Sequence, residues 1–197
     1  MELHGPSDVA RFLADEEAAQ NALAELRWPN GQVACPFCDG GEKKKVWETC
    51  YESLPSGKKT FRRQWKCAAC CKKFSVTSRT IFDKSRISIG KWFHAINIMC
   101  VDKKGLNSAQ LARELHVRYK SAWFMLHRLR QAMLQEPLAS ILSRRDSLAE
   151  TDYRRVSFHG LSLKDALIGL LAIPDPYATK LKYVEDKNKK ASPPVEL

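Results

Sequence analysis

The sequence predicts an α+β fold in which a small β segment is followed by a bundle of helices. Two observations lead to this fold class. Two pairs of cysteines flank a stretch of short β patterns, and apolar residues take up helical spacing after position 89. The chain has 197 residues, of which 44% are hydrophobic, enough for one or two modest cores.

Residues 1–31 are expected to form an N-terminal helical segment. Apolar side chains recur near helical spacing between Val9 and Leu26, and Asp15 stands where it can cap the start of a second helix. The run Trp28-Pro29-Asn30-Gly31 ends this segment, because proline lacks the backbone donor that a helix needs.

Residues 32–80 are expected to form a zinc ribbon. Two Cys-x-x-Cys pairs, Cys35 with Cys38 and Cys67 with Cys70, are separated by 28 residues. Each pair can chelate one ion from a tight turn, while short strands near 46–52, 60–67 and 73–77, with a hairpin turn at 55–58, close a tetrahedral site. Four thiolates leave no open position for water or substrate, so the expected role of the Zn²⁺ is structural.

Three further cysteines, Cys50, Cys71 and Cys100, are not expected to bind the ion. Cys71 competes with Cys70, but the Cys-x-x-Cys spacing gives the better chelating geometry. Two alternatives to the zinc site are unligated core cysteines and a single iron bound by four sulfurs. The basic surroundings suit an anion-binding ribbon better than an electron carrier.

Residues 81–135 are expected to form a helix-turn-helix region. The stretch from Ser108 to Leu129 fits that template, with Ala112 as the small residue of the first helix. His116 takes the turn position usually given to Gly, where the left-handed backbone is tolerated at some cost. Leu115 and Val117 bracket the turn as core residues, and the expected buried face of the second helix consists of Ala122, Met125, Leu126, Leu129 and Met133.

The opposite face of the second helix carries the residues expected to meet phosphates and base edges of duplex DNA. The expected DNA contacts there are Arg118, Lys120, Ser121, Phe124 and Arg128, with Gln131 beside them. An ordinary solvated helix face is the alternative. Tyr119, Trp123 and His127 fit either the core or the contact surface and are left unassigned.

The net charge of +11 comes from the middle of the chain. Residues 42–134 hold 21 Lys and Arg against 6 Asp and Glu, while the flanking segments are acidic or nearly neutral. Such a block is costly to compact without a polyanion, which favours a nucleic-acid partner over a mere solubility surface. The residues expected to clamp phosphates from the ribbon are Lys43, Lys44, Lys45, Arg62, Arg63, Lys72 and Lys73.

The remainder of the chain is expected to contain little structure. Residues 136–160 are expected to be a linker, residues 161–176 a helix capped by Ser162 that docks on its own domain or on a second subunit, and residues 177–197 a disordered tail. The sequence has neither a secretory signal pattern nor a long apolar run, which predicts a cytoplasmic, nucleoid-associated protein with reduced cysteines and no membrane partner.

Several ordered motifs carry a resemblance to a known family: Arg27-Trp28-Pro29, Cys35-Pro36-Phe37-Cys38, Trp65-Lys66-Cys67-Ala68-Ala69-Cys70, Phe74-Ser75-Val76-Thr77, Thr80-Ile81-Phe82 and the run from Ala122 to Arg128. Over roughly residues 7–135 the chain resembles the N-terminal region of a bacterial insertion-sequence transposase family with a zinc-ribbon head. The resemblance implies that Cys35, Cys38, Cys67 and Cys70 bind zinc. Arg79 departs from the family pattern, in which Gly usually precedes Thr80.

Members of that family carry a ribonuclease-H-like catalytic domain after the DNA-binding region, and no catalytic residue is expected here. Only 62 residues follow Gln135, they show no run of β strands, and a two-metal nuclease needs carboxylates gathered by a sheet of some 100 residues or more. The expected function is therefore a non-catalytic, zinc-dependent DNA-binding regulator or transposition factor without a small-molecule substrate.

Two alternatives are the DNA-binding subunit of a split transposase and a zinc-ribbon adaptor that binds protein. RNA is a further candidate polyanion. A homodimer would match paired half-sites on DNA.

Overall fold

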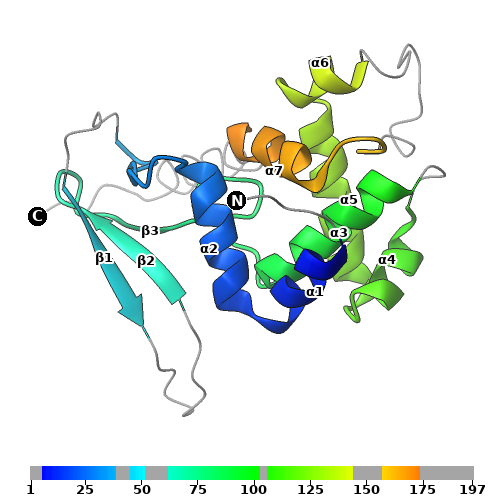
Figure 1. Ribbon diagram of the computed structural model, residues 1–197, viewed down its shortest axis with the longest axis horizontal. Coiled ribbons are helices and arrows are strands. Elements are labelled where there is room, and N and C mark those ends of the chain that lie inside the picture. The colour runs from blue at the N-terminus through cyan, green and yellow to red at the C-terminus, as the bar shows by residue number, and fades with distance from the viewer. Residues whose placement is uncertain (1–5, 39–44, 52–61, 103–105, 144–156, 174–197) are drawn as a thin grey trace, which may run out of the picture.

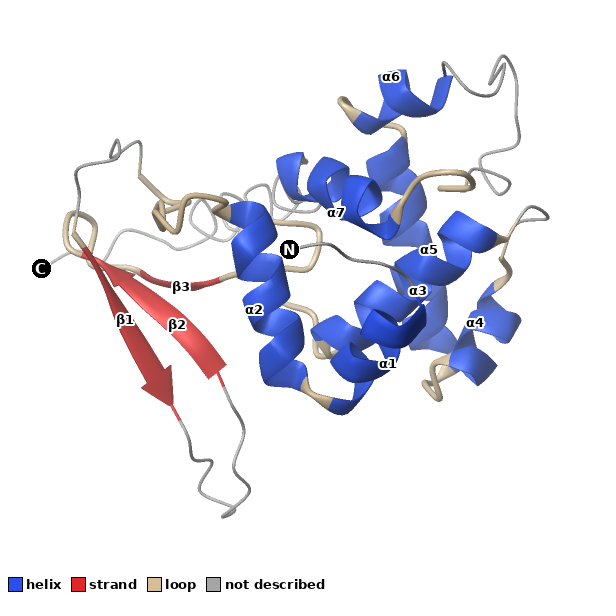
Figure 2. Cartoon of the chain, viewed as in Figure 1, coloured by secondary structure: helices blue, strands red, loops and turns tan. Residues whose placement is uncertain are grey.

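The computed structural model describes residues 6–38, 45–51, 62–102, 106–143 and 157–173. Two helices, α1 (Pro6–Ala14) and α2 (Glu16–Arg27), precede the strands β1 (Val46–Tyr51), β2 (Arg62–Cys67) and β3 (Lys73–Ser75), after which come α3 (Ile89–Val101), α4 (Ser108–Glu114), α5 (Tyr119–Met133), α6 (Leu138–Ser143) and α7 (Leu163–Ala172). The sheet lies at one side of the molecule and the bundle of α3–α7 at the other, with α2 between them (Figure 1). This arrangement confirms the predicted α+β class (Figure 2).

The sheet is antiparallel, with strand order β1-β2-β3. Trp65 pairs with Phe74 across β2 and β3, and both side chains are buried. Trp28, just after α2, packs edge-on against Trp65 with ring centroids 5.0 Å apart and against Phe74 at 6.4 Å. These three rings attach the sheet to the end of α2, because a sheet this small cannot bury a core of its own.

The N-terminal segment forms two helices, as Asp15 led us to expect. Its carboxylate accepts hydrogen bonds from the backbone N–H groups of Glu17 (2.9 Å) and Ala18 (3.2 Å), which would otherwise lack partners at the first turn of α2. The helix α1 packs on α3 through Phe12 and Phe93, whose ring centroids lie 5.2 Å apart. Gly90 permits this contact, because an added Cβ would lie 2.0 Å from the carbonyl oxygen of Phe12.

The C-terminal helix α7 docks on the chain's own bundle, chiefly on α3 (Figure 1). Ser162 caps it as predicted, since its hydroxyl oxygen accepts a hydrogen bond from the backbone N–H of Asp165 at 3.1 Å. Leu163, Leu167 and Leu170 are buried, so this helix covers apolar surface of the core.

The structure corrects the expected linker at residues 136–160. Part of it forms α6, and Leu138 and Leu142, one helical turn apart, are buried. At its other end Phe158 is fully buried and the hydroxyl of Ser157 donates to the carbonyl oxygen of Met99 at 2.6 Å. The predicted hairpin turn at 55–58, residues 144–156 and the predicted tail at 177–197 lie outside the described residues.

Within the described ranges, none of the helices combines the length and the apolar character that a bilayer crossing requires.

Candidate metal centre and nucleic-acid interface

The two cysteine pairs converge on one point. Cys35 and Cys70 place their Sγ atoms 3.6 Å apart, Cys38 and Cys67 place theirs 3.7 Å apart, and all four sulfurs lie within 4.8 Å of one another. Four thiolates at tetrahedral corners about 2.3 Å from one zinc ion are about 3.8 Å apart. The donor set and its spacing therefore fit a single Zn²⁺, with each knuckle supplying two ligands.

Backbone hydrogen bonds shape both knuckles. The N–H of Phe37 points at Cys35 Sγ (3.4 Å), and the second knuckle is closed by the N–H of Cys71 donating to the carbonyl of Cys67 (3.0 Å). The N–H of Ala68 donates to the carbonyl of Lys45 (3.0 Å), which fixes the second knuckle beside the start of β1. The ligand sulfurs are thus positioned by local backbone geometry as well as by the sheet.

Local hydrogen bonds also favour the thiolate form of Cys67. The backbone N–H of Cys70 is the main cause that lowers the pKa of Cys67 to about 6, and the N–H of Ala69 and the thiols of Cys38 and Cys70 add to it, while burial opposes the shift. A thiolate is the form that binds metal.

The expected choice of Cys70 over Cys71 agrees with the cluster. Cys71 is exposed, and its Sγ lies near the carbonyl oxygen of Ala68 rather than among the four sulfurs. Its backbone is left-handed (φ 55°), a conformation that lets the chain leave the second knuckle sharply. Cys100 is buried in α3, where burial above all, and the charge of Asp165, raise the pKa of its thiol to about 12. The side chain of Cys50 lies outside the described residues.

A tight turn after β3 joins the ribbon to the helical bundle. The half-buried Arg27 guanidinium, from the end of α2, donates to the carbonyl oxygens of Val76 and of Ser78, the latter at 2.9 Å. Burial lowers the pKa of Arg27 to about 10, with the charge of Asp83 opposing the shift, so the side chain stays cationic at neutral pH. Within the turn, the hydroxyl of Thr80 donates to the carbonyl of Thr77 at 2.7 Å.

Arg79 occupies a left-handed position in this turn, with φ 59°. Its backbone N–H donates to Asp83 Oδ2 (3.1 Å), and its guanidinium donates to the carbonyl of Pro36 (3.1 Å) in the first knuckle. The turn therefore keeps its shape although Arg stands where the resembled family usually has Gly. Arg79 could not be predicted as a site residue, because its partner Pro36 lies 43 positions away and no local pattern connects the two.

The helices expected within 108–129 are present as α4 and α5. Asn107 caps α4 by accepting the N–H of Gln110 at 2.8 Å, and His116 has the predicted left-handed backbone (φ 49°). The N–H of Val117 donates to the carbonyl of Ala112 at 3.1 Å, which closes the turn. Every residue of the predicted buried face of α5 is buried: Ala122, Met125, Leu126, Leu129 and Met133.

The prediction for Arg128 is wrong. This residue is 3% exposed, and its Nη1 donates to the carbonyl oxygen of Asp83 at 2.9 Å. Its guanidinium also lies over the ring of Phe124, with Cζ 5.2 Å from the ring centroid. Arg128 therefore ties α5 to the segment that precedes α3 instead of facing a partner.

The outward face of α5 is more aromatic than its sequence pattern predicted. Of the predicted contacts there, Arg118, Lys120 and Phe124 are exposed and Ser121 is half-buried. Tyr119 and Trp123 are 58% and 50% exposed, and His127 stacks on Trp123 with ring centroids 4.9 Å apart. The helical spacing from Lys120 through Trp123 and His127 was the signal that could have placed these residues on one face.

The predicted phosphate clamps of the ribbon fall into three groups. Lys45, Lys72 and Lys73 are exposed. Arg63 is engaged inside the protein: it forms an ion pair with Glu48 and donates to Asn21 Oδ1 at 2.6 Å, which joins β2 to β1 and α2. Lys43 and Lys44, and the side chain of Arg62, lie outside the described residues.

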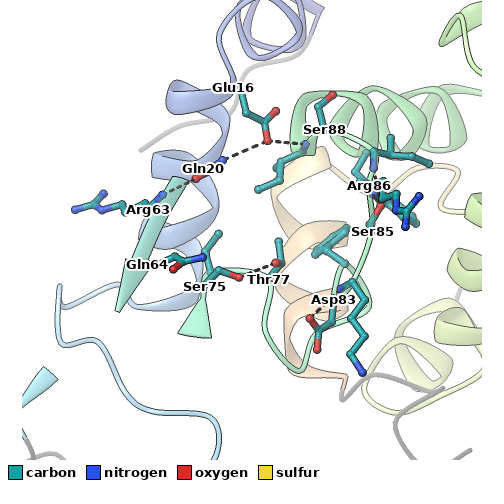
Figure 3. Close-up of a pocket in the computed structure, with 16 residues that line it drawn as sticks. Glu16, Gln20, Arg63, Gln64, Ser75, Thr77, Asp83, Ser85, Arg86 and Ser88 are labelled. Carbon is teal, nitrogen blue, oxygen red and sulfur yellow. Dashed lines mark hydrogen bonds between the residues drawn. The ribbon is translucent and has the colours of Figure 1, made fainter. Parts of the chain in front are cut away.

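A groove of about 420 Å³ lies where the ribbon meets α2 and the start of α3 (Figure 3). Its polar walls largely bind one another. Glu16 accepts the N–H of Ile89 (3.1 Å), and Gln20 accepts the N–H of Arg63 (3.3 Å). The hydroxyls of Ser75 and Thr77 lie 2.9 Å apart. This groove is the seam between ribbon and bundle, and α2 bridges it, because Gln20 binds β2 and Glu16 binds the start of α3.

Fold and site together define the class: an antiparallel sheet whose two Cys-x-x-Cys knuckles meet at one point is a zinc ribbon, here joined to a helical bundle. Residues 14–73 match the transposase zinc-ribbon domain family. A protein described as an uncharacterized protein in transposable element ISH50, from Halobacterium salinarum, is 29% identical over 125 residues. These matches confirm the resemblance that the motifs indicated, although this relative is archaeal rather than bacterial.

The ISH50 alignment covers 64% of this chain and 38% of the relative, so the chain spans well under half of that protein's length. No solved structure matches the chain significantly.

Proposed function

We propose that this chain is a zinc-dependent DNA-binding protein that grips duplex DNA without cutting it, as a regulator or as a transposition-related factor. The observation that carries the proposal is the combination, in one chain, of a transposase-type zinc ribbon with an exposed, basic and aromatic helix face. The ion would be held by Cys35, Cys38, Cys67 and Cys70, and its contribution would be structural.

The helix pair α4–α5 would act as the helix-turn-helix. In that motif the second helix enters the major groove and reads base edges near its N-terminus. Arg118 and Lys120 at the start of α5 would meet phosphates, and Trp123 and Phe124 offer apolar surface for thymine methyl groups. Arg128 is not part of this set, because it is buried.

The ribbon would add contacts that carry no sequence information. Lys45, Lys72 and Lys73 are exposed there, and they belong to the basic block of residues 42–134. Lysines of this kind bind the phosphate backbone and release counterions, which gives an affinity that falls steeply with salt. The charge block thus supports a polyanion as partner, and α5 supports a duplex with an open major groove.

The experiment is a titration of zinc-loaded protein against duplexes selected from a random pool, at several salt concentrations. We expect recovery of a consensus sequence and a log-log salt slope of about −4 or steeper, since four or more phosphates would be neutralised. Lys120→Ala should weaken binding by about tenfold. Lys164→Ala on α7, outside the basic block, is the matched control and should bind like the wild type.

Other outcomes of this titration identify other functions. Binding without a consensus would contradict the sequence-specific regulator, and the absence of any salt-dependent binding to duplex DNA would leave the ribbon as a protein adaptor. A dimer stays a prediction, which the mass of the protein–DNA complex would test, because two copies on paired half-sites double the protein mass per duplex.

A further inference from the structure

The turn after β3 holds an arginine in a conformation that costs energy and that glycine would adopt freely. Arg79 has φ 59°, where a Cβ atom crowds the backbone. Strained positions of this kind persist when the surroundings over-determine them, and they cluster at functional sites. An arginine at a strained, exposed position that glycine would occupy more easily therefore suggests that its side chain has a function.

The surroundings of Arg79 do fix its backbone. Arg27 binds the carbonyl of Ser78, the N–H of Thr80 donates to the carbonyl of Thr77 (3.1 Å), and Asp83 accepts the N–H of Arg79 itself (3.1 Å). The guanidinium then projects from a rigid turn toward the first zinc knuckle, where it meets Pro36.

A second cation lies at the same knuckle. The Cζ atom of Arg79 lies 5.5 Å from the centroid of the Phe37 ring, and the Nζ atom of Lys72 lies 5.4 Å from that centroid. Phe37 is half-buried, while Arg79 and Lys72 are both exposed. The aromatic ring stabilises both cations and limits their conformational freedom, so the Arg79 Cζ and the Lys72 Nζ are held no more than about 11 Å apart on the surface.

We propose that Arg79 and Lys72, held against Phe37 of the first zinc knuckle, form a pre-organised clamp for the phosphodiester backbone of nucleic acid. The clamp rests on the proposed DNA-binding function and deepens it by naming a backbone contact that the ribbon makes. A guanidinium offers several donors in a fixed fork, so one donor can stay on Pro36 while others bind a phosphate oxygen.

The charge around the clamp favours the phosphodiester backbone of nucleic acid as its ligand. The clamp lies within the basic block of residues 42–134, and the described acidic groups nearest to it along the chain, Glu48 and Asp83, already bind Arg63 and the backbone N–H of Arg79. A pair of ordered cations in such a field attracts a polyanion more strongly than it attracts a neutral surface.

The chain offers a matched control in Lys84. Lys84 is also exposed and basic, also has a left-handed backbone (φ 55°) and lies in the same connector, but it is not held against Phe37. Arg79→Gly and Lys84→Gly therefore remove one charge each and relieve the same backbone conformation. Only the first removes a member of the clamp.

The test measures affinity for a fixed duplex and its salt dependence, with the full zinc-loaded chain. We expect Arg79→Gly to bind about fivefold to tenfold more weakly and to lower the magnitude of the salt slope by about 1, while Lys84→Gly changes affinity by less than about twofold. Arg79→Lys should recover only part of the affinity, because it keeps the charge but loses the fixed fork of donors. Zinc content should match the wild type, and the melting temperature should stay within about 4 °C, since relief of the left-handed backbone offsets the lost contacts.

Two results would overturn the clamp while leaving DNA binding intact: an unchanged slope and affinity for Arg79→Gly, or equal losses for Arg79→Gly and Lys84→Gly. Equal losses would mean that both residues contribute only through their net positive charge and not through a specific contact. If the wild-type chain itself shows no salt-dependent affinity for the duplex, the proposed function fails first, and the clamp fails with it.

Discussion

The guanidinium of Arg128 on α5 donates a hydrogen bond of 2.9 Å to the carbonyl oxygen of Asp83, 45 positions earlier in the chain. The bond joins the second helix of the α4–α5 pair to the connector that leaves the zinc ribbon. The connector that leaves the ribbon and the helix that we propose to read DNA are therefore in direct contact, an arrangement that suits a protein that contacts a single duplex with both parts.

Replacement of Arg128 should cost stability and not recognition. Arg128→Ala removes a buried, charge-assisted hydrogen bond and leaves a cavity, so we expect the free energy of unfolding to fall by about 2–3 kcal/mol. Denaturant unfolding measures this loss. Lys120→Ala, on the exposed face of the same helix, should leave stability within about 0.5 kcal/mol. If Arg128→Ala is as stable as the wild type but binds DNA more weakly, the structural role is wrong and Arg128 contacts DNA.

Adjacent cysteines should behave in opposite ways. Cys70→Ser removes one of the four sulfurs, so the purified protein should lose its bound zinc and the order of the sheet. Cys71→Ser should keep both, because the Cys71 side chain lies outside the cluster. Cys71→Gly should keep the metal and gain up to about 1 kcal/mol, since glycine adopts φ 55° without strain. Metal analysis and thermal unfolding check both changes, and retention of zinc by Cys70→Ser would contradict the assigned ligand set.

Gly90 should not tolerate a side chain. The Cβ of Gly90→Ala would lie 2.0 Å from the Phe12 carbonyl oxygen, so α1 and α3 would have to separate, at a cost of about 2–3 kcal/mol. Gly31→Ala is the matched control, because that position has open space around it and only its backbone (φ 68°) resists the change. We expect the control to lose about 1 kcal/mol. A larger loss at Gly31 than at Gly90 would argue against the packing of α1 on α3.

The buried thiol of Cys100 should make the protein sensitive to alkali. Its pKa is raised to about 12 in the folded state from an ordinary value of 9.0, so above pH 9 the unfolded chain releases a proton that the folded chain keeps. The free energy of unfolding then falls by about 1.4 kcal/mol per pH unit from this group until pH 12. Cys100→Ala should lack this contribution, and its stability should fall less steeply from pH 9 to 11. Parallel slopes for the two proteins would contradict a protonated, buried thiol.

The parts of the molecule that the sequence predicted are those set by local chemistry. Cys-x-x-Cys spacing fixes a knuckle within four residues, Asp15 and Ser162 cap their helices within three residues, and His116 takes the turn that its neighbours impose. Each of these features depends on contacts between residues close in sequence, which a pattern records.

The parts that the sequence missed depend on contacts between distant residues. Arg128 lies at the edge of the apolar face of α5, where spacing alone allows either environment, and the carbonyl of Asp83 decides between them. The helix α6 has only six residues, too few for a periodic signal, and is stabilised where Leu138 is buried beside Gly169 of α7. Arg79 gains its role only because the fold brings Pro36 and Phe37 to its turn.

The most direct test of the account is X-ray absorption at the zinc edge of the purified, zinc-loaded chain. Four sulfurs whose Sγ atoms converge within 4.8 Å predict one zinc per chain with four sulfur neighbours at about 2.3 Å and no nitrogen or oxygen in the first coordination sphere. A spectrum dominated by nitrogen or oxygen ligands, or a folded chain that holds no zinc, would contradict the central claim.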